Sequence, residues 1–138
     1  METENKLKNK EHFRHLLSIA MADGILDKAE LDFLFKISNQ FFITREELSE
    51  IIQKPNEFHD ENIKLTQQDR AEQLYDLVEM MSLDGEADQR EQELCMSFGV
   101  AMGIDSEKIE DFIKTVAEKI ESGESKETIA SSLVEKGI

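Results

Sequence analysis

The chain contains one nine-residue segment twice, and this duplication constrains its fold more than any other feature. The first copy runs from Ala22 to Glu30 and the second from Leu83 to Glu91. Four positions of the copies are identical and comprise Asp23, Gly24, Asp27 and Glu30, then Asp84, Gly85, Asp88 and Glu91. Each copy lies between two segments of helical hydrophobic periodicity, so each is predicted to be the turn of a helical hairpin. We call these two turns the elbows, and the sequence distance from Ala22 to Leu83 the repeat offset.

The helices around the elbows are predicted to repeat in the same register. Two apolar stripes with helical spacing are separated by the repeat offset, namely Phe13, Leu16, Leu17 and Ala20, then Leu74, Leu77, Val78 and Met81. A pattern kept over three helices predicts an internal repeat. We therefore expect an all-α fold of seven helices in a single compact domain of 138 residues. It would comprise pseudo-two-fold-related three-helix repeats over 11–53 and 66–117, a linker over 54–65 and a C-terminal helix over 125–136.

Residues that cap helices stand at the expected helix starts. Capping boxes are predicted for Asp27 with Glu30, for Thr44 with Glu47 and for Thr66 with Asp69. Ser125 is the expected N-cap of the last helix, Asp105 is expected to open the sixth, and Gly24 is expected to end the first. The helix after the first elbow is apolar on most sides, which places it in the middle of a bundle. The third helix is expected to turn Leu48, Ile51 and Ile52 inward.

The net charge of the chain restricts the classes of molecule that can bind to it. The formal charge is −15, from 31 acidic and 16 basic side chains. Such a surface repels nucleic acids and anionic lipids, whereas cations and basic protein surfaces are favoured partners. The chain has no run of apolar residues of bilayer length and nothing like a signal peptide, so we expect no membrane insertion and a cytoplasmic location. Cys95, the only cysteine, aligns with Leu34 and is expected to be a buried, inert thiol.

The acidic elbows support two interpretations. Their carboxylates predict a cation site of oxygen ligands, which suits Ca²⁺, Mg²⁺ or Mn²⁺, with the candidate ligands Asp23, Asp27, Glu30, Asp84, Asp88 and Glu91. The alternative is structural, because Asp27 and Glu30 form a capping box and Gly24 and Gly85 suit a turn. The elbows also imitate part of a calcium-binding EF-hand loop. However, Ile19 and Met21 stand where its first and third ligands belong, which argues against an EF-hand.

The Ala-Asp-Gly-x-x-x-x-x-Glu segment from Ala22 to Glu30, set between two amphipathic helices, resembles the signature of the tellurite-resistance TerB-like family. The resemblance covers about residues 11–117 and departs from the pattern at Leu83, which replaces the alanine in the second copy. It implies a compact all-helical fold with pseudo-two-fold symmetry and a link to metal stress. It also implies divalent-cation binding by the six elbow carboxylates. Related domains serve as protein-interaction modules, including one in a membrane-anchored DnaJ-type co-chaperone.

Other chemically active residues give weaker patterns. His12 and His15 could share a helix face as a metal pair, but the better interpretation is surface or half-buried histidines. Methionines 80, 81, 96 and 102 could line a pliable groove, although at helical spacing they more often fill a core. No catalytic triad, phosphate-binding loop or zinc motif occurs.

These patterns predict a non-enzymatic acidic binding domain that binds a divalent cation weakly, docks a basic protein partner, or does both in a bacterial stress or metal-resistance setting. The alternative is a pure interaction scaffold, such as a homodimer, whose elbows are only helix caps. A carboxylate enzyme would require the two elbows to meet in one cleft.

Overall fold

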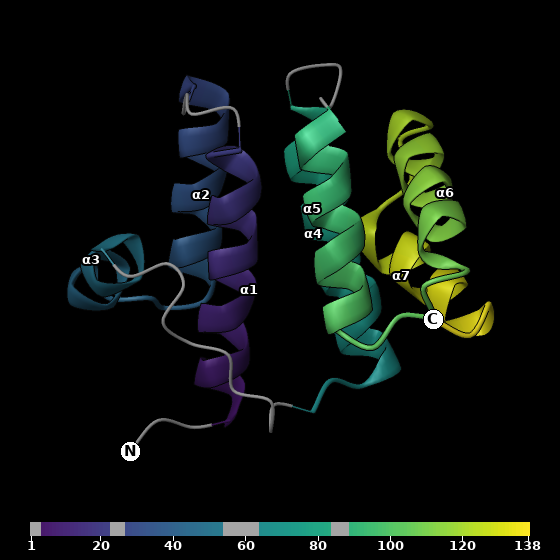
Figure 1. Ribbon diagram of the computed structural model, residues 1–138, viewed down its shortest axis with the longest axis horizontal. Helices are drawn as coiled ribbons and strands as arrows, with labels where there is room; N and C mark the ends of the chain where they lie inside the picture. Colours follow the sequence, from purple (N-terminus) through teal and green to yellow (C-terminus); the bar gives the residue numbers. More distant parts are fainter. Residues whose placement is uncertain (1–3, 23–26, 54–63, 84–88) are drawn as a thin grey trace. The chain divides into compact units, whose positions relative to one another are not determined.

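The computed structural model describes residues 4–22, 27–53, 64–83 and 89–138, which form seven α-helices and no strand (Figure 1). The helices are α1 (Glu4–Ala20), α2 (Lys28–Gln40), α3 (Arg45–Gln53), α4 (Gln67–Ser82), α5 (Gln89–Ala101), α6 (Ile109–Glu121) and α7 (Lys126–Glu135). The predicted all-α class and the number of helices are therefore confirmed. Among the described residues, no helix has the length and the apolar composition to cross a membrane.

The chain divides into two compact units, residues 1–64 (unit 1) and residues 65–138 (unit 2). The division falls at the end of the predicted linker, most of which lies outside the described residues. In unit 1, α1 and α2 pack against each other. Their buried apolar side chains include Phe13, Leu16 and Ile19 of α1 and Phe33, Leu34 and Ile37 of α2.

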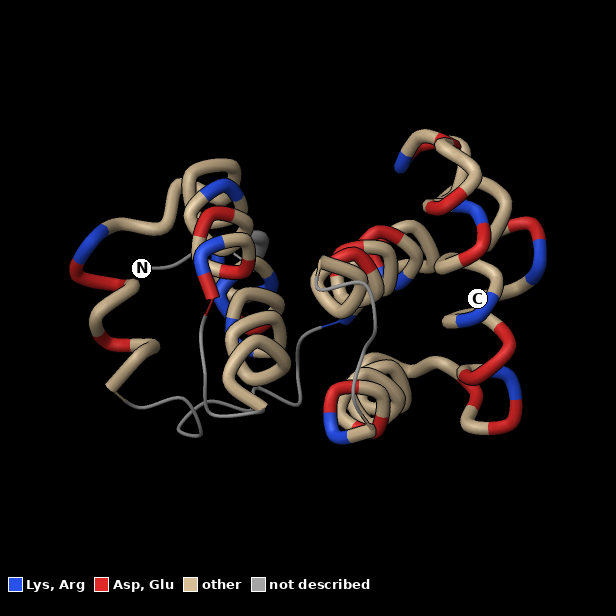
Figure 2. Tube along the Cα trace, turned by 90° about the horizontal axis from the view of Figure 1, so that it is seen from above, with Lys and Arg blue, Asp and Glu red and all other residues tan. Residues whose placement is uncertain are grey.

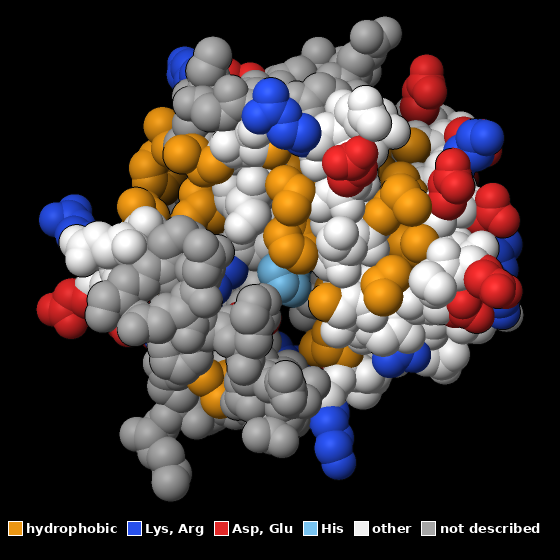
Figure 3. Space-filling model, viewed as in Figure 1, with side chains coloured by type: hydrophobic (Ala, Val, Ile, Leu, Met, Phe, Trp, Pro, Cys, Tyr) orange, Lys and Arg blue, Asp and Glu red, His pale blue; other side chains and the backbone are white. Residues whose placement is uncertain are grey.

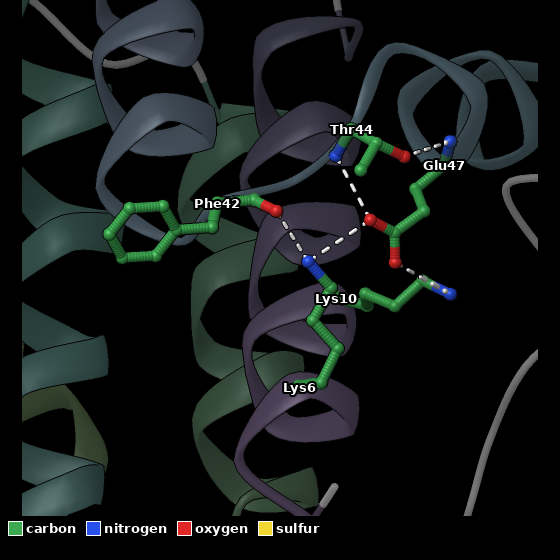
Figure 4. A network of polar contacts seen from close by, with 5 residues as sticks. All are labelled: Lys6, Lys10, Phe42, Thr44 and Glu47. Atoms are coloured by element: carbon green, nitrogen blue, oxygen red, sulfur yellow. Dashed lines mark hydrogen bonds and ion pairs between the residues drawn. The ribbon is translucent and has the colours of Figure 1, made fainter. Parts of the chain in front are cut away.

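A polar network ties α3 to α1 in unit 1 (Figure 4). Lys6 Nζ lies 3.0 Å from Glu47 Oε1, and Lys10 Nζ lies 3.5 Å from Glu47 Oε2. The Glu47 carboxylate also accepts a hydrogen bond of 2.9 Å from the Thr44 backbone N–H. Burial alone would raise the pKa of Glu47, but the hydrogen bonds from Thr44 and Lys6 outweigh it and lower the pKa from 4.5 to about 2. The Lys6 ammonium in addition donates to the carbonyl of Phe42.

Helix α4 is the centre of unit 2, where it contacts α5, α6 and α7. The seventh helix buries Ile129, Ala130 and Leu133 and packs on α4 and α6. Polar contacts fix both of its ends. Lys126 Nζ lies 3.0 Å from Asp76 Oδ1, and the Arg70 guanidinium donates to the carbonyl of Ile138 at 2.9 Å. This helix has no counterpart among the described residues of unit 1, as the sequence predicted.

The two units share local structure at positions separated by the repeat offset. Helices α2 and α5 each span 13 residues, and both of their ends are displaced by that offset. Both end in a Schellman motif, in which the N–H of Ile43 donates to Ser38 O (2.9 Å) and the N–H of Ile104 donates to Gly99 O (3.0 Å). The left-handed residue of the motif is Phe42 (φ 54°) in unit 1 and Gly103 (φ 102°) in unit 2. The pseudo-two-fold relation of the units stays a prediction.

The helix caps follow the sequence. The three predicted capping boxes are present, at Asp27, Thr44 and Thr66, and Ser125 caps α7. The start of α6 differs from the prediction. Asp105 O accepts hydrogen bonds from the N–H groups of Lys108 and Ile109, and its carboxylate accepts one from Glu107 N–H. A turn over residues 106–108 is thereby formed, so α6 begins at Ile109 instead of at Asp105.

Two packing predictions for unit 1 are wrong. Helix α2 is not covered on all sides, because Leu31 and Phe35 are exposed while Phe33, on the opposite face, is buried. In α3, Ile51 is fully buried but Ile52 is 55% exposed. Successive residues of a helix point about 100° apart, so these neighbouring isoleucines cannot share one face. Hydrophobic side chains gather at the surface on the side of Figure 3 where α2 lies.

Candidate functional site

Of the first elbow, the structure describes Ala22 and the residues from Asp27 onward, while Asp23, Gly24 and the two residues after them lie outside the described residues. Asp27 Oδ1 accepts a hydrogen bond of 2.8 Å from the backbone N–H of Glu30, and Glu30 Oε1 accepts one of 3.3 Å from the backbone N–H of Asp27. The Glu30 side chain is 3% exposed. Both carboxylates therefore hold the start of α2, as the capping interpretation requires.

Of the second elbow, the structure describes Leu83 and the residues from Gln89 onward, while Asp84, Gly85 and Asp88 lie outside the described residues. Glu91 is 4% exposed and occupies the third position of α5, as Glu30 does in α2. Burial of a carboxylate at both positions is a shared feature of the repeat. A buried carboxylate requires hydrogen bonds or a positive charge close by, since leaving water is unfavourable for an ion.

The structure brings the six candidate ligands together only in part. It pairs Asp27 with Glu30 on one helix start, and it places Glu91 at the corresponding point of α5. Within the described ranges, no group of three or more His, Cys, Asp or Glu residues is arranged to hold a metal ion. The predicted cation site depends on Asp23, Asp84 and Asp88, so it stays a prediction.

The two histidines of α1 are buried, which corrects the expectation of surface or half-buried side chains. His12 is 2% exposed, and its ring centroid lies 5.8 Å from that of Phe41. His15 is 8% exposed, with Nε2 3.4 Å from Glu11 Oε1. Glu11 also contacts Arg14 at 3.3 Å, so the carboxylate joins two buried cationic or polar groups on one helix. The two histidines therefore belong to a buried structural cluster within unit 1.

Cys95 is fully buried in α5, which confirms the prediction of a core thiol. Burial raises the pKa of this thiol to about 12. The thiolate, which is the nucleophilic form, is therefore scarce at neutral pH.

Unit 2 contains a groove that sequence reasoning did not assign. Its volume is about 350 Å³, and its lining residues come from the second half of α4, the first half of α5 and α6: Val78, Met81, Ser82, Gln92, Met96, Glu110, Ile113, Lys114 and Ala117. We call it the α4–α6 groove. The floor includes buried Val78 and Met81, while Gln92, Glu110 and Lys114 are exposed at its edges. Concave apolar surfaces of this volume are typical of binding sites.

The methionine pattern was the available signal for this groove. Met81 and Met96 line it, whereas Met80 and Met102 are buried in the core, so the two interpretations of the methionines each hold for part of the set. Flexible methionine side chains suit a surface that adapts to a partner. The helical spacing of the methionines could not distinguish Met81 and Met96 from Met80 and Met102, because a residue that lines a groove differs from a core residue only in what covers it.

The electrostatic charge is concentrated in the unit that contains the groove. Residues 65–138 include 18 acidic and seven basic side chains, a formal charge of −11. Residues 1–64 include 13 acidic and nine basic side chains, a formal charge of −4. Acidic segments recur around the C-terminal part of the chain in Figure 2. The groove therefore lies in a field that attracts cations and basic peptides.

The resemblance to the TerB-like family rests on the elbows. Of the first elbow, the structure describes Ala22, Asp27 and Glu30 as helix-flanking and capping residues. Of the second, it describes Leu83 and Glu91. When the chain was compared with protein-family models, with curated proteins and with solved structures, none of the three comparisons gave a match.

Proposed function

We propose that the chain is a non-enzymatic acidic docking domain whose α4–α6 groove binds a basic amphipathic helix of a protein partner. The observation that carries this proposal is the groove itself, an apolar concavity in a unit of charge −11. An amphipathic helix recognises such a groove by placing apolar anchors at i, i+3 or i+4 and i+7 on its floor. Basic residues on its other faces gain from the acidic surroundings.

The charged residues at the edges of the groove favour one orientation of the bound helix. Glu110 and Lys114 lie one turn apart on α6, and both line the groove. The carboxylate of Glu110 favours a Lys or Arg of the partner, whereas Lys114 favours an acidic or amide side chain one turn further along. The apolar floor supplies most of the affinity, and the charges select the partner and its orientation.

A defined peptide tests this function. The ligand is a fluorescently labelled peptide of leucine and lysine, about 18 residues long, with leucine at i, i+3, i+4 and i+7. Fluorescence anisotropy with the full chain should give a dissociation constant of roughly 1–100 μM that rises with salt. A matched peptide with glutamate in place of lysine should bind at least ten-fold more weakly.

Variants locate the binding site. Met96→Lys places a charge on the wall of the groove and should weaken binding at least ten-fold. Glu110→Lys should weaken binding and reduce its dependence on salt. Glu107→Lys makes the same change of charge just before α6, outside the groove lining, and serves as the control. Equal losses for Glu110→Lys and Glu107→Lys, with no effect of Met96→Lys, would show that only net charge matters and would refute docking in the groove.

Weak divalent-cation binding at the elbows is the second function that we propose. What supports it is the burial of Glu30 and Glu91 at equivalent helix positions, since a cation stabilises buried carboxylates. Calorimetric titration with Ca²⁺, Mg²⁺, Mn²⁺ and Zn²⁺ tests it, with the Asp23→Asn/Asp84→Asn variant as comparison. No heat up to a few millimolar of any ion would refute it. A role in bacterial metal stress is supported by the TerB-like resemblance alone.

A pure interaction scaffold, homodimeric and with elbows that only cap helices, remains the alternative that we propose for the same chain. The hydrogen bonds between Asp27 and Glu30 favour it. Under this alternative, Asp27→Ala lowers the free energy of unfolding by about 1 kcal/mol and leaves peptide binding unchanged.

A further inference from the structure

Four exposed apolar side chains of unit 1 correspond to residues of the α4–α6 groove, and two of them, Leu31 and Phe35, lie one turn apart on α2. Met21, Leu31, Phe35 and Ile52 are 38–55% exposed. The repeat offset relates each of them to a residue that lines the α4–α6 groove, and these counterparts are Ser82, Gln92, Met96 and Ile113. The predicted repeat therefore assigns the four side chains to the position in unit 1 that the groove occupies in unit 2. We call them the unit 1 face.

The close contact of α5 with α6 in unit 2 involves residues that differ in unit 1. Ile109 packs against the backbone of Gly99, where a Cβ would overlap its Cδ1 atom and lie 3.0 Å from its Cγ1. This close approach holds α6 against α5. The corresponding residues of unit 1 are Leu48 and Ser38, and the Ser38 hydroxyl donates a hydrogen bond of 2.9 Å to the carbonyl of Phe35. Leu48 is half-buried, and Ile52, one turn further along α3, is exposed.

The charges around the unit 1 face are balanced. The exposed charged residues of α2 and α3 comprise three basic ones, Lys28, Lys36 and Arg45, and three acidic ones, Asp32, Glu46 and Glu50. A basic partner has no advantage at such a surface. A second copy of the same surface is a better partner, because a two-fold axis can bring positive groups of one copy opposite negative groups of the other.

We propose that the unit 1 face docks a second copy of this chain, forming a two-fold symmetric dimer with Leu31 and Phe35 at its centre. An apolar centre with charges of both signs around it is the composition of homodimer interfaces. When a partner removes exposed aromatic and aliphatic side chains on one helix face from water, the free energy of the system falls and the complex is stabilised. This inference specifies the scaffold arrangement proposed above, and it does not depend on the α4–α6 groove.

Sedimentation equilibrium of the full chain tests the dimer. Between about 1 and 100 μM the mass should rise from one chain to two. Phe35→Asp should raise the dimer dissociation constant at least ten-fold, and Ile52→Lys on α3 should do the same. Val100→Asp is the matched control, because Val100 is 44% exposed on α5, outside this face, and its change should leave the dimer intact. A chain that stays monomeric at 100 μM, or a dimer that only Val100→Asp disrupts, would overturn the proposal.

Charge reversal supplies a second test that does not remove apolar contacts. Lys28→Glu/Lys36→Glu makes the face negative, and Asp32→Lys/Glu50→Lys makes it positive. Each variant alone should dimerise at least ten-fold more weakly, because like charges then meet across the axis. An equimolar mixture should form a heterodimer again. Failure of the mixture to associate, with both variants helical by circular dichroism, would overturn the proposal.

The two proposed surfaces are distinguishable in the same samples. Phe35→Asp should bind the leucine-lysine peptide as the unchanged chain does, while Met96→Lys should dimerise as the unchanged chain does. If Phe35→Asp abolishes peptide binding but leaves the dimer intact, the dimer proposal is wrong and unit 1 contains the peptide site.

Discussion

At the scale of single residues, Phe42 is the clearest departure from a relaxed backbone. It ends α2 with φ at 54° and is 83% exposed, while its counterpart Gly103 has φ at 102°. A bulky side chain in the left-handed region is strained by about 1 kcal/mol, and an exposed ring regains little of that by burial. The Schellman hydrogen bond of Ile43 to Ser38 holds the residue there.

Phe42→Gly should therefore raise the free energy of unfolding, by up to about 1 kcal/mol, in urea denaturation. The control is Val100→Gly, also at an exposed position but within a helix, which should lower it by roughly 0.5 kcal/mol. Destabilisation by Phe42→Gly would show that contacts of the ring stabilise the fold by more than the backbone strain at this residue destabilises it.

Glu47 gives a prediction about pH. Its pKa of about 2 in the folded chain lies below the ordinary 4.5, so folding favours the charged form. The stability that this carboxylate contributes is present above about pH 4.5 and is lost as the pH falls towards 2. Glu47→Gln should thus be destabilising near neutral pH, and the gap between the two proteins should narrow in urea unfolding as the solution is acidified. The neighbouring Glu46→Gln is the control and should change stability little at any pH. A gap that stays constant from neutral to acidic pH would contradict the role of the charge.

At the scale of helices, the contact of α5 with α6 depends on Gly99. Gly99→Ala forces Ile109 to move, and the overpacking should exceed the gain in helix propensity, with a net loss of about 1 kcal/mol. Ile109→Val removes the Cδ1 atom that meets the new methyl group. The double variant should be about 1 kcal/mol more stable than the sum of the two single changes predicts. Additive effects in urea denaturation would show that the two residues do not constrain each other.

The helix ends were predictable because their causes are local. A Ser, Thr or Asp with an acidic residue three positions later identified the starts of α2, α3 and α4, and the structure has the capping boxes at those positions. The helices on either side of the elbows were predictable for a similar reason, since a stripe of spacing 3.6 needs only the sequence. The Schellman motif at Phe42 could not be predicted, because a phenylalanine gives no indication of a positive φ.

Whether a helix face is covered could not be predicted. Leu31, Phe35 and Ile52 have the same hydrophobicity as their buried neighbours, and their exposure is decided by which elements pack against them. For the same reason, the methionine pattern allowed a groove but favoured core packing, and it did not indicate which methionines line the α4–α6 groove. At the candidate cation site, local pattern predicted the capping role of Asp27 and Glu30, while the burial of Glu91 depends on packing around α5.

At the scale of the whole molecule, equivalent positions of the predicted repeat carry surfaces of different chemistry in the two units. The counterparts of Met21, Leu31 and Phe35 are Ser82, Gln92 and Met96, so the second surface is more polar than the first. The added α7 and the charge of −11 also belong to unit 2 alone. The two proposals accordingly assign a second copy of the chain to the first face and a basic helix to the second.

The last prediction concerns the independence of unit 2. A fragment of residues 65–138 retains all the contacts of α4 with α5, α6 and α7, including the salt bridge of Lys126 with Asp76. It should be helical by circular dichroism and should unfold cooperatively, with a urea m value of about 1 kcal/mol/M for a unit of this size. Residues 65–123 are the control, because removing α7 uncovers the face of α4 on which Ile129 and Leu133 pack, and cooperative unfolding should be lost. If both fragments unfold alike, α7 adds nothing to the core of unit 2, and the stability of α4 must have another source.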